Sequence, residues 1–171
     1  EEALNAALKA VKNKKLSSVV GDMVSTEAMY ALKLLSQGLG GNYECRVDKT
    51  CLSAHDRSGY LGTSEIADID HCDNIILIGT NPKIESPVFN ARIRKAWLNG
   101  AEIHMIGEKA DLTYEYKYLG ADRLALQALV EDKKLNFNSK TAVILGQGAL
   151  IDSDGKIVLQ AVKKLVEKFS C

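Results

Sequence analysis

The chain has 171 residues, 46% hydrophobic and 26% charged, which is typical of a globular protein of one-domain size. Its 22 basic residues balance 22 acidic residues, so no net charge favours an anionic surface, and we expect no nucleic-acid partner. No apolar stretch approaches the roughly 20 residues that span a bilayer, so we expect no direct membrane insertion.

Helical and β-rich segments alternate along the chain. Helical periodicity is present at residues 4–11, 28–39, 88–98, 124–130 and 157–169, and β-rich runs lie at 18–24, 43–47, 74–78, 102–106 and 141–145. This alternation predicts an α/β fold with a doubly wound, mainly parallel sheet and helices on both faces. Residues 48–62 have no sustained period and are expected to form a long surface loop.

We expect residues 1–171 to form a single domain. The chain begins at Glu1 within a helical pattern and without an initiator Met. We therefore expect a fragment of a longer polypeptide.

The most informative stretch is residues 75–82, which read Ile-Ile-Leu-Ile-Gly-Thr-Asn-Pro. A short apolar run that ends at a glycine is typical of a buried parallel strand that delivers a loop to the carboxyl edge of a sheet, where α/β folds bind ligands. The next helix is expected to begin at Ser86-Pro87, as N-cap and first helical residue. The loop, Gly79, Thr80, Asn81 and Pro82, is either a phosphate or cofactor site or a scaffold without a ligand.

Other motifs of enzymes are incomplete. Gly146-Gln147-Gly148 resembles the start of a dinucleotide fingerprint, but Ile151 stands where a third glycine would be, so a plain glycine turn is favoured. The nucleophile-elbow pattern is absent, and neighbouring loop residues such as His55-Asp56-Arg57 seldom converge on one site. We therefore predict no catalytic residue in this chain.

The four cysteines, Cys45, Cys51, Cys72 and Cys171, show no Cys-x-x-Cys spacing. The nearest approach to a metal signature is Cys51-x-x-x-His55 together with His71-Cys72, which lacks paired ligand spacing. Iron-sulfur and zinc frameworks are therefore not encoded here, and we predict that no metal is bound.

Two further segments bear on interactions. The helix at 88–98 carries Arg92, Arg94 and Lys95, with an apolar face expected to contain Val88, Phe89, Ile93, Ala96 and Trp97. The basic face is either solvated or a docking surface, because Arg pairs bidentately with carboxylates and is enriched at interfaces. Tyr114, Tyr116 and Tyr118 alternate with polar residues, which favours a half-buried extended segment or a contact surface.

Three segments resemble one known family. Residues 61–73 (Leu-Gly-Thr-Ser-Glu-Ile-Ala-Asp-Ile-Asp-His-Cys-Asp), 75–82 and 90–98 (Asn-Ala-Arg-Ile-Arg-Lys-Ala-Trp-Leu) are similar to a domain of respiratory complex I, NADH-quinone oxidoreductase. It is the molybdopterin-oxidoreductase-like domain of the 75 kDa subunit, which is called the G subunit in bacteria. Asp111-Leu112-Thr113-Tyr114 with Tyr118-Leu119-Gly120 strengthens the match, which covers about residues 3–170.

The resemblance implies a subunit of the enzyme that passes electrons from NADH through FMN and iron-sulfur clusters to quinone. It implies 2Fe-2S and 4Fe-4S clusters elsewhere in the parent subunit and none in this segment. It also implies other complex I subunits as partners, and a place in the peripheral arm on the cytoplasmic or mitochondrial matrix side of the respiratory membrane.

In active molybdopterin enzymes the loop that matches Gly79, Thr80, Asn81 and Pro82 approaches the pterin dinucleotide, and the next strand ends in Asp-Pro-Arg. Here that strand ends in Gly107-Glu108-Lys109, which argues against cofactor binding. We therefore expect a non-redox structural scaffold, in which Arg92, Arg94 and Lys95 form an interface. The first alternative is a pterin- or nucleotide-binding oxidoreductase domain that uses the loop, and the second is a thiamine-diphosphate-enzyme middle domain, which also uses an apolar strand ending in Gly-Thr.

Overall fold

The structure is a computed structural model that describes residues 1–21, 23–45, 50–52, 57–62, 64–132, 137–151 and 153–169. The chain divides into two compact units, residues 1–48 and 49–171, and each is described by itself. The single domain expected for residues 1–171 stays a prediction. Of the predicted loop at 48–62, the structure describes 50–52 and 57–62, where Arg57–Gly59 forms a turn of 3-10 helix, η1.

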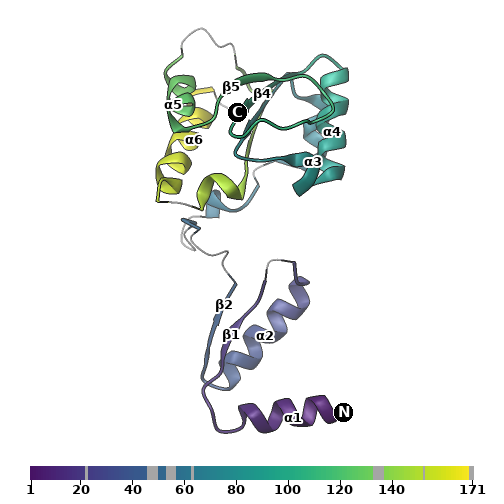
Figure 1. The fold of residues 1–171 in the computed structure, drawn as a ribbon, viewed down its shortest axis with the longest axis vertical. Coiled ribbons are helices and arrows are strands. Elements are labelled where there is room, and N and C mark those ends of the chain that lie inside the picture. The colour runs from purple at the N-terminus through teal and green to yellow at the C-terminus, as the bar shows by residue number, and fades with distance from the viewer. Residues whose placement is uncertain are drawn as a thin grey trace. The chain divides into compact units, whose positions relative to one another are not determined.

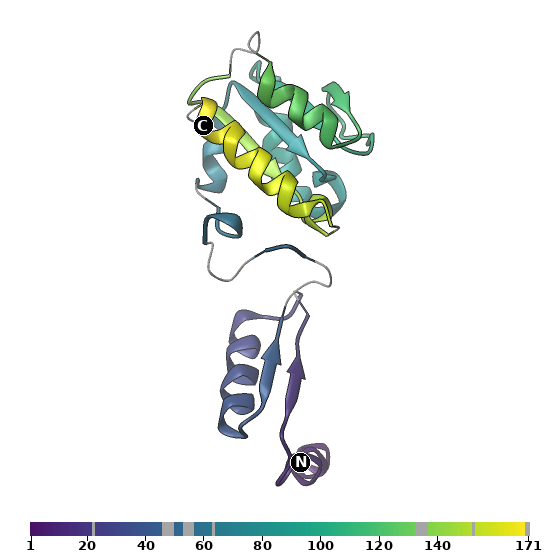
Figure 2. The same cartoon turned by 90° about the vertical axis from the view of Figure 1, so that its left-hand side faces the viewer.

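The N-terminal unit is a small β-α-β arrangement preceded by a helix. Its elements are α1 (Glu2–Val11), β1 (Ser17–Val19), α2 (Thr26–Gly38) and β2 (Asn42–Glu44). The two strands pair in parallel, and α2 lies alongside them (Figure 2). The Ser25 side chain caps α2 by accepting the N–H of Ala28. The buried Ser36 hydroxyl donates to Ser18 Oγ at 2.6 Å, which ties α2 to β1.

The second unit contains a four-stranded parallel sheet with the strand order β5-β4-β3-β6. The strands are β3 (Asn74–Ile78), β4 (Glu102–Ile106), β5 (Lys117–Gly120) and β6 (Thr141–Leu145). The predicted α/β class with parallel strands is confirmed, and β3, β4 and β6 have the predicted bounds. The edge strand β5 was not predicted as a strand.

Helices cover both faces of this sheet (Figure 1). The 3-10 helix η2 (Ile66–His71) and α4 (Pro87–Leu98) lie on one face, and α5 (Arg123–Glu131) and α6 (Gly155–Phe169) lie on the other. Ile75 and Leu77 of β3 belong to the first core, and Ile76 and Ile78 to the second. Because β3 is buried on both faces, its sequence is a continuous apolar run without alternation.

The structure differs from the sequence-based expectations at two places after β3. A four-residue helix, α3 (Pro82–Glu85), lies between the loop and α4 and was not predicted. Ser86 is the N-cap of α4 and Pro87 its first residue, as predicted, although the Ser86 side chain makes no capping hydrogen bond. Val88 was expected in the core but is 80% exposed. The core face of α4 is formed by Asn90, Ile93 and Ala96, and Val88 lies on the side of the helix away from Ile93.

Only the end of the tyrosine-rich segment belongs to a strand. Tyr114 is buried in the core beneath α4 and Tyr116 is half-buried, and β5 begins at Lys117. Of the three tyrosines, only Tyr118 therefore lies in a strand. In the described part of the chain, no helix is long and apolar enough to cross a membrane.

Candidate functional site at the carboxyl edge of the sheet

The loop formed by Gly79, Thr80, Asn81 and Pro82 follows β3 at the carboxyl edge of the parallel sheet, as predicted. Gly79 has a φ of 57°, a conformation that side-chain-bearing residues rarely adopt. Its N–H donates to the carbonyl of Ile106 at the end of β4, at 2.8 Å. The first residue of the loop is therefore fixed to the neighbouring strand.

A second loop packs directly against the first. Gly146 follows β6, and its N–H donates to the Ile78 carbonyl at 2.9 Å. A Cβ on Gly146 would lie 2.3 Å from the Gly79 carbonyl oxygen, and a Cβ on Gly79 would lie 2.5 Å from the Ala149 Cβ. Both glycines are therefore required by the close approach of the two backbones.

The predicted glycine turn at 146–151 is present as a 3-10 helix, η3 (Gln147–Leu150), with α6 beginning only at Gly155. Its contact with the β3 loop was not predicted. The two loops follow strands that are adjacent in the sheet although they are far apart in sequence. The repeated glycines were the only signal in the sequence.

A cavity of about 660 Å³ lies where the loops after all four strands meet. This volume is within the range of small-molecule sites. Three acidic side chains (Glu85, Glu108 and Asp122) and two basic ones (Lys109 and Arg123) line it. Acidic side chains thus exceed basic ones in the lining of this cavity.

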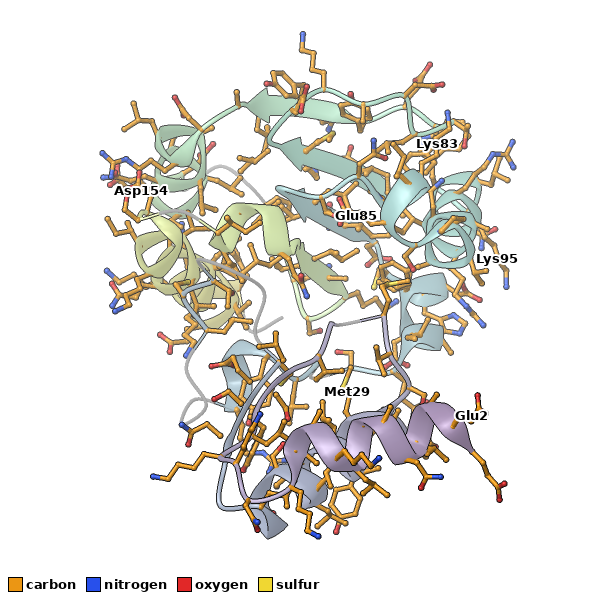
Figure 3. The ribbon with its side chains drawn as sticks, turned by 60° about the horizontal axis from the view of Figure 1, so that its bottom comes forward. Glu2, Met29, Lys83, Glu85, Lys95 and Asp154 are labelled. Atoms are coloured by element: carbon orange, nitrogen blue, oxygen red, sulfur yellow. The ribbon has the colours of Figure 1, made fainter. Side chains whose placement is uncertain are left out.

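The Glu85 carboxylate takes the hydrogen-bond donors of the β3 loop. Its Oε1 accepts the backbone N–H of Asn81 at 2.6 Å, and its Oε2 accepts the Thr80 hydroxyl at 2.8 Å. Figure 3 shows Glu85 beside the carboxyl ends of the strands. Such loops bind phosphate oxygens through backbone N–H groups and hydroxyls. Here the Glu85 carboxylate accepts the hydrogen bonds that a phosphate would otherwise accept.

Three of the other charged side chains of the cavity, Asp122, Arg123 and Lys109, also have partners within the chain. The Asp122 carboxylate accepts the N–H groups of Leu124 and Ala125 as the N-cap of α5. Arg123 Nη1 lies 3.4 Å from Asp154 Oδ2, and Lys109 Nζ lies 4.7 Å from the centroid of the Tyr118 ring. Each cation therefore has a contact within the chain.

The residues of this cavity do not fit a pterin dinucleotide, whose phosphates are anionic. Two donors of the β3 loop, the Asn81 N–H and the Thr80 hydroxyl, are occupied by Glu85, and the lining carries more acid than base. One feature favours a ligand: the Asn81 Oδ1 atom is buried and has no hydrogen-bond partner among the described residues. A single acceptor does not replace the missing anion contacts.

The three residues of the predicted interface have different roles in the structure. Arg92 Nη1 and Lys95 Nζ both contact Asp70 Oδ2, at 3.0 and 2.8 Å. The hydrogen bond from Lys95 and the charge of both cations hold the pKa of Asp70 below its usual range. Arg94 is exposed and makes no hydrogen bond or ion pair with the described residues. Sequence reasoning missed Asp70, which lies in the preceding 3-10 helix.

The structure describes no cluster of three or more His, Cys, Asp or Glu side chains that could hold a metal ion. Within the described ranges, Cys45, Cys51 and Cys72 are free. His55, Asp56 and Cys171 lie outside the described residues. The expected absence of a metal and of a catalytic residue stays a prediction.

Comparison with known proteins identifies the family of the chain. The chain is 34% identical to the mitochondrial NADH-ubiquinone oxidoreductase 78 kDa subunits of Candida albicans and Neurospora crassa, over 93% and 90% of its length. It is 32% identical to the NADH-quinone oxidoreductase G subunit of Rickettsia bellii over 99% of its length. It spans 22% of the length of each fungal relative and 26% of the bacterial one. The molybdopterin oxidoreductase family model matches residues 1–171, so the chain belongs to the molybdopterin oxidoreductase family.

Proposed function

We propose that this chain is part of the large iron-sulfur subunit of NADH-quinone oxidoreductase, respiratory complex I. That enzyme passes electrons from NADH through FMN and iron-sulfur clusters to quinone, and the 2Fe-2S and 4Fe-4S clusters of the subunit lie outside this segment. The proposal is supported by three relatives named as subunits of this enzyme, each matched over nine-tenths or more of the chain.

The proposed place of the chain is the peripheral arm, on the cytoplasmic or mitochondrial matrix side of the respiratory membrane. There it contacts other complex I subunits, and Arg92, Arg94 and Lys95 contribute to the interface. Two of the relatives are named as mitochondrial, which supports the mitochondrial alternative.

Within that subunit the segment acts as a non-redox scaffold. The observation that carries this proposal is the position of Glu85, whose carboxylate bonds the Asn81 N–H and the Thr80 hydroxyl. A family loop that contacts a dinucleotide in active enzymes is here closed by a side chain of its own. The parallel sheet and its two cores remain as a rigid support.

The second candidate is a pterin- or nucleotide-binding oxidoreductase domain. It is favoured by the cavity of about 660 Å³ at the carboxyl edge and by the unpartnered Asn81 Oδ1 within it. In that case a ligand amide or amino group would donate to Asn81, and Glu85 would turn away from the loop on binding.

A titration of the purified domain with a pterin guanine dinucleotide distinguishes the two candidates. The scaffold proposal predicts no saturable binding by the wild type. Saturable binding that is lost in Asn81→Asp and kept in Glu108→Ala, the matched control at the same cavity, would establish the second candidate.

Membership in complex I is tested with the full-length parent protein. An affinity tag on that protein should recover the assembled enzyme, with NADH-quinone oxidoreductase activity on a native gel. Recovery of the parent protein without other subunits of the enzyme would contradict the proposal.

A further inference from the structure

The outer face of α4 carries apolar side chains that the fold leaves unused. Val88 is 80% exposed and Leu98 is 61% exposed. With Ala91 and Lys95 they follow the spacing of one helical face, on the side opposite the buried Ile93. The neighbouring helix η2, which packs against α4, also carries an exposed apolar side chain, Ile66, at 65% exposure.

The same helix has an excess of positive charge. Residues 87–98 contain Arg92, Arg94 and Lys95 and no acidic residue. The Asp70 carboxylate is bonded to Arg92 and Lys95 and offsets one of these three positive charges. Arg94 has no hydrogen-bond or ion-pair partner among the described residues. Figure 3 shows Lys95 at the outer side of α4. The cation on this face, Lys95, shares Asp70 with Arg92. Arg94 lies at the flank of the face, four residues before the exposed Leu98 and therefore beside it on the helix surface.

We propose that the outer face of α4 binds an acidic segment of another subunit of the parent assembly. An apolar side chain of that segment contacts Val88 or Leu98, and a carboxylate of the segment accepts two hydrogen bonds from the Arg94 guanidinium. This inference rests on the proposed function and deepens it, because it names the surface and the chemistry of the partner. It also divides the roles within the proposed interface: Arg94 contacts the partner, whereas Arg92 and Lys95 support that surface by holding η2 on α4.

The dimensions favour a protein segment as the occupant. Val88 and Leu98 are ten positions apart, which corresponds to about 15 Å along the helix. About five residues of extended chain cover that distance, with two or three side chains facing α4. Two apolar residues at the ends of one helix do not form the continuous apolar stripe with which a helix enters a membrane surface.

The test uses the full-length parent protein in its assembled enzyme. A photo-reactive phenylalanine analogue replaces Leu98, and the cross-linked peptide is identified by mass spectrometry. The proposal predicts a cross-link to a segment of another subunit with an excess of Asp and Glu. Arg94→Glu should lower the yield of this cross-link at least about tenfold, because it places like charges together. Lys164→Glu, an exposed charge reversal on α6, should leave the yield unchanged.

Circular dichroism and the unfolding midpoint of each variant establish that the domain still folds. A cross-link to a second copy, to any other part of the parent polypeptide, to a basic segment or to lipid would overturn the proposal. So would an unchanged yield in Arg94→Glu. Failure to recover the wild-type parent protein with NADH-quinone oxidoreductase would instead refute the proposed function, so the two failures are distinguishable.

Discussion

The Glu85 carboxylate accepts the backbone N–H of Asn81 at 2.6 Å, so the residue that ends α3 closes the loop from which that helix begins. The same carboxylate holds the Thr80 hydroxyl at 2.8 Å. These two hydrogen bonds satisfy the Asn81 N–H and the Thr80 hydroxyl, which would otherwise be available to a ligand. It makes the stability of the loop depend on a side chain of the chain itself.

Glu85→Ala should therefore lower the free energy of unfolding by about 1 kcal/mol, because two hydrogen bonds to a charged acceptor are lost at a solvent-accessible position. Urea denaturation measures the change. The matched control is Glu108→Ala, which removes another exposed acid from the same cavity and should change stability by about 0.5 kcal/mol or less. Equal effects of the two substitutions would show that Glu85 has no special role.

Gly146→Ala should destabilise the second unit by about 2 kcal/mol or more, because the new Cβ would lie 2.3 Å from the Gly79 carbonyl oxygen. The φ of Gly146 is −77°, so steric contact with the facing loop, and not backbone strain, is the cause. Gly62→Ala is the control, since its nearest contact would be 3.9 Å away. Thermal unfolding of both variants tests this prediction, and a neutral Gly146→Ala would mean that the two loops are not in close contact.

Tyr114→Phe should cost about 1–2 kcal/mol, because it leaves the buried Asn90 Oδ1 without the hydroxyl that donates to it at 2.8 Å. Burial raises the pKa of Tyr114, so the hydroxyl remains a donor throughout the neutral range. Tyr118→Phe removes a more exposed hydroxyl, bonded to the Gly107 carbonyl, and should cost about 0.5 kcal/mol or less. A double-mutant cycle with Asn90→Ala should give a coupling energy well above zero, and an additive result would exclude the pair as a stabilising contact.

His104 should make the fold sensitive to acid. The side chain is buried edge-on against Phe137, and burial holds its pKa below the usual range, with the charge of Lys117 acting in the same direction. Glu102, whose Oε2 is 3.7 Å from His104 Nε2, opposes this shift. The unfolded chain therefore takes up a proton below pH of about 6.5 more readily than the folded chain does, and stability falls as the pH is lowered.

Between pH 7.5 and 5.5 the histidine contribution should amount to at most about 1.4 kcal/mol, the limit set by the ordinary pKa of the unfolded state. His104→Leu should lose that part of the pH dependence, whereas His71→Gln, at an exposed position, should retain it. Urea unfolding at the two pH values gives the comparison. An identical pH dependence in wild type and His104→Leu would refute the assignment.

The central strands could be predicted from the sequence because burial on both faces leaves a continuous apolar run, as in residues 75–78. The edge strand β5 could not, since Lys117 and Tyr118 are exposed and its short run resembles a loop. The α3 helix was missed because Pro82 was taken to close the loop, whereas it begins that helix, with Asn81 as the N-cap.

The position of the candidate site was predictable from the strand-to-loop transition at Gly79, but its composition was not. The contact between Gly79 and Gly146 depends on β6 lying beside β3, and strand order is not encoded in local pattern. Similarly, the basic residues of α4 could be identified from the sequence, but their pairing could not. Asp70 lies 22 residues before Arg92 and contacts Arg92 and Lys95 but not Arg94, and this contact depends on the tertiary structure.

The central claim is that the β3 loop is a closed scaffold within an electron-transferring enzyme and holds no pterin cofactor. The most direct measurement is calorimetric titration of the full-length parent protein, purified in its complex, with a pterin guanine dinucleotide, together with molybdenum analysis of the same sample. The account predicts no saturable binding at this loop and no molybdenum in stoichiometric amount. Saturable binding that Asn81→Asp abolishes, accompanied by stoichiometric molybdenum, would contradict it.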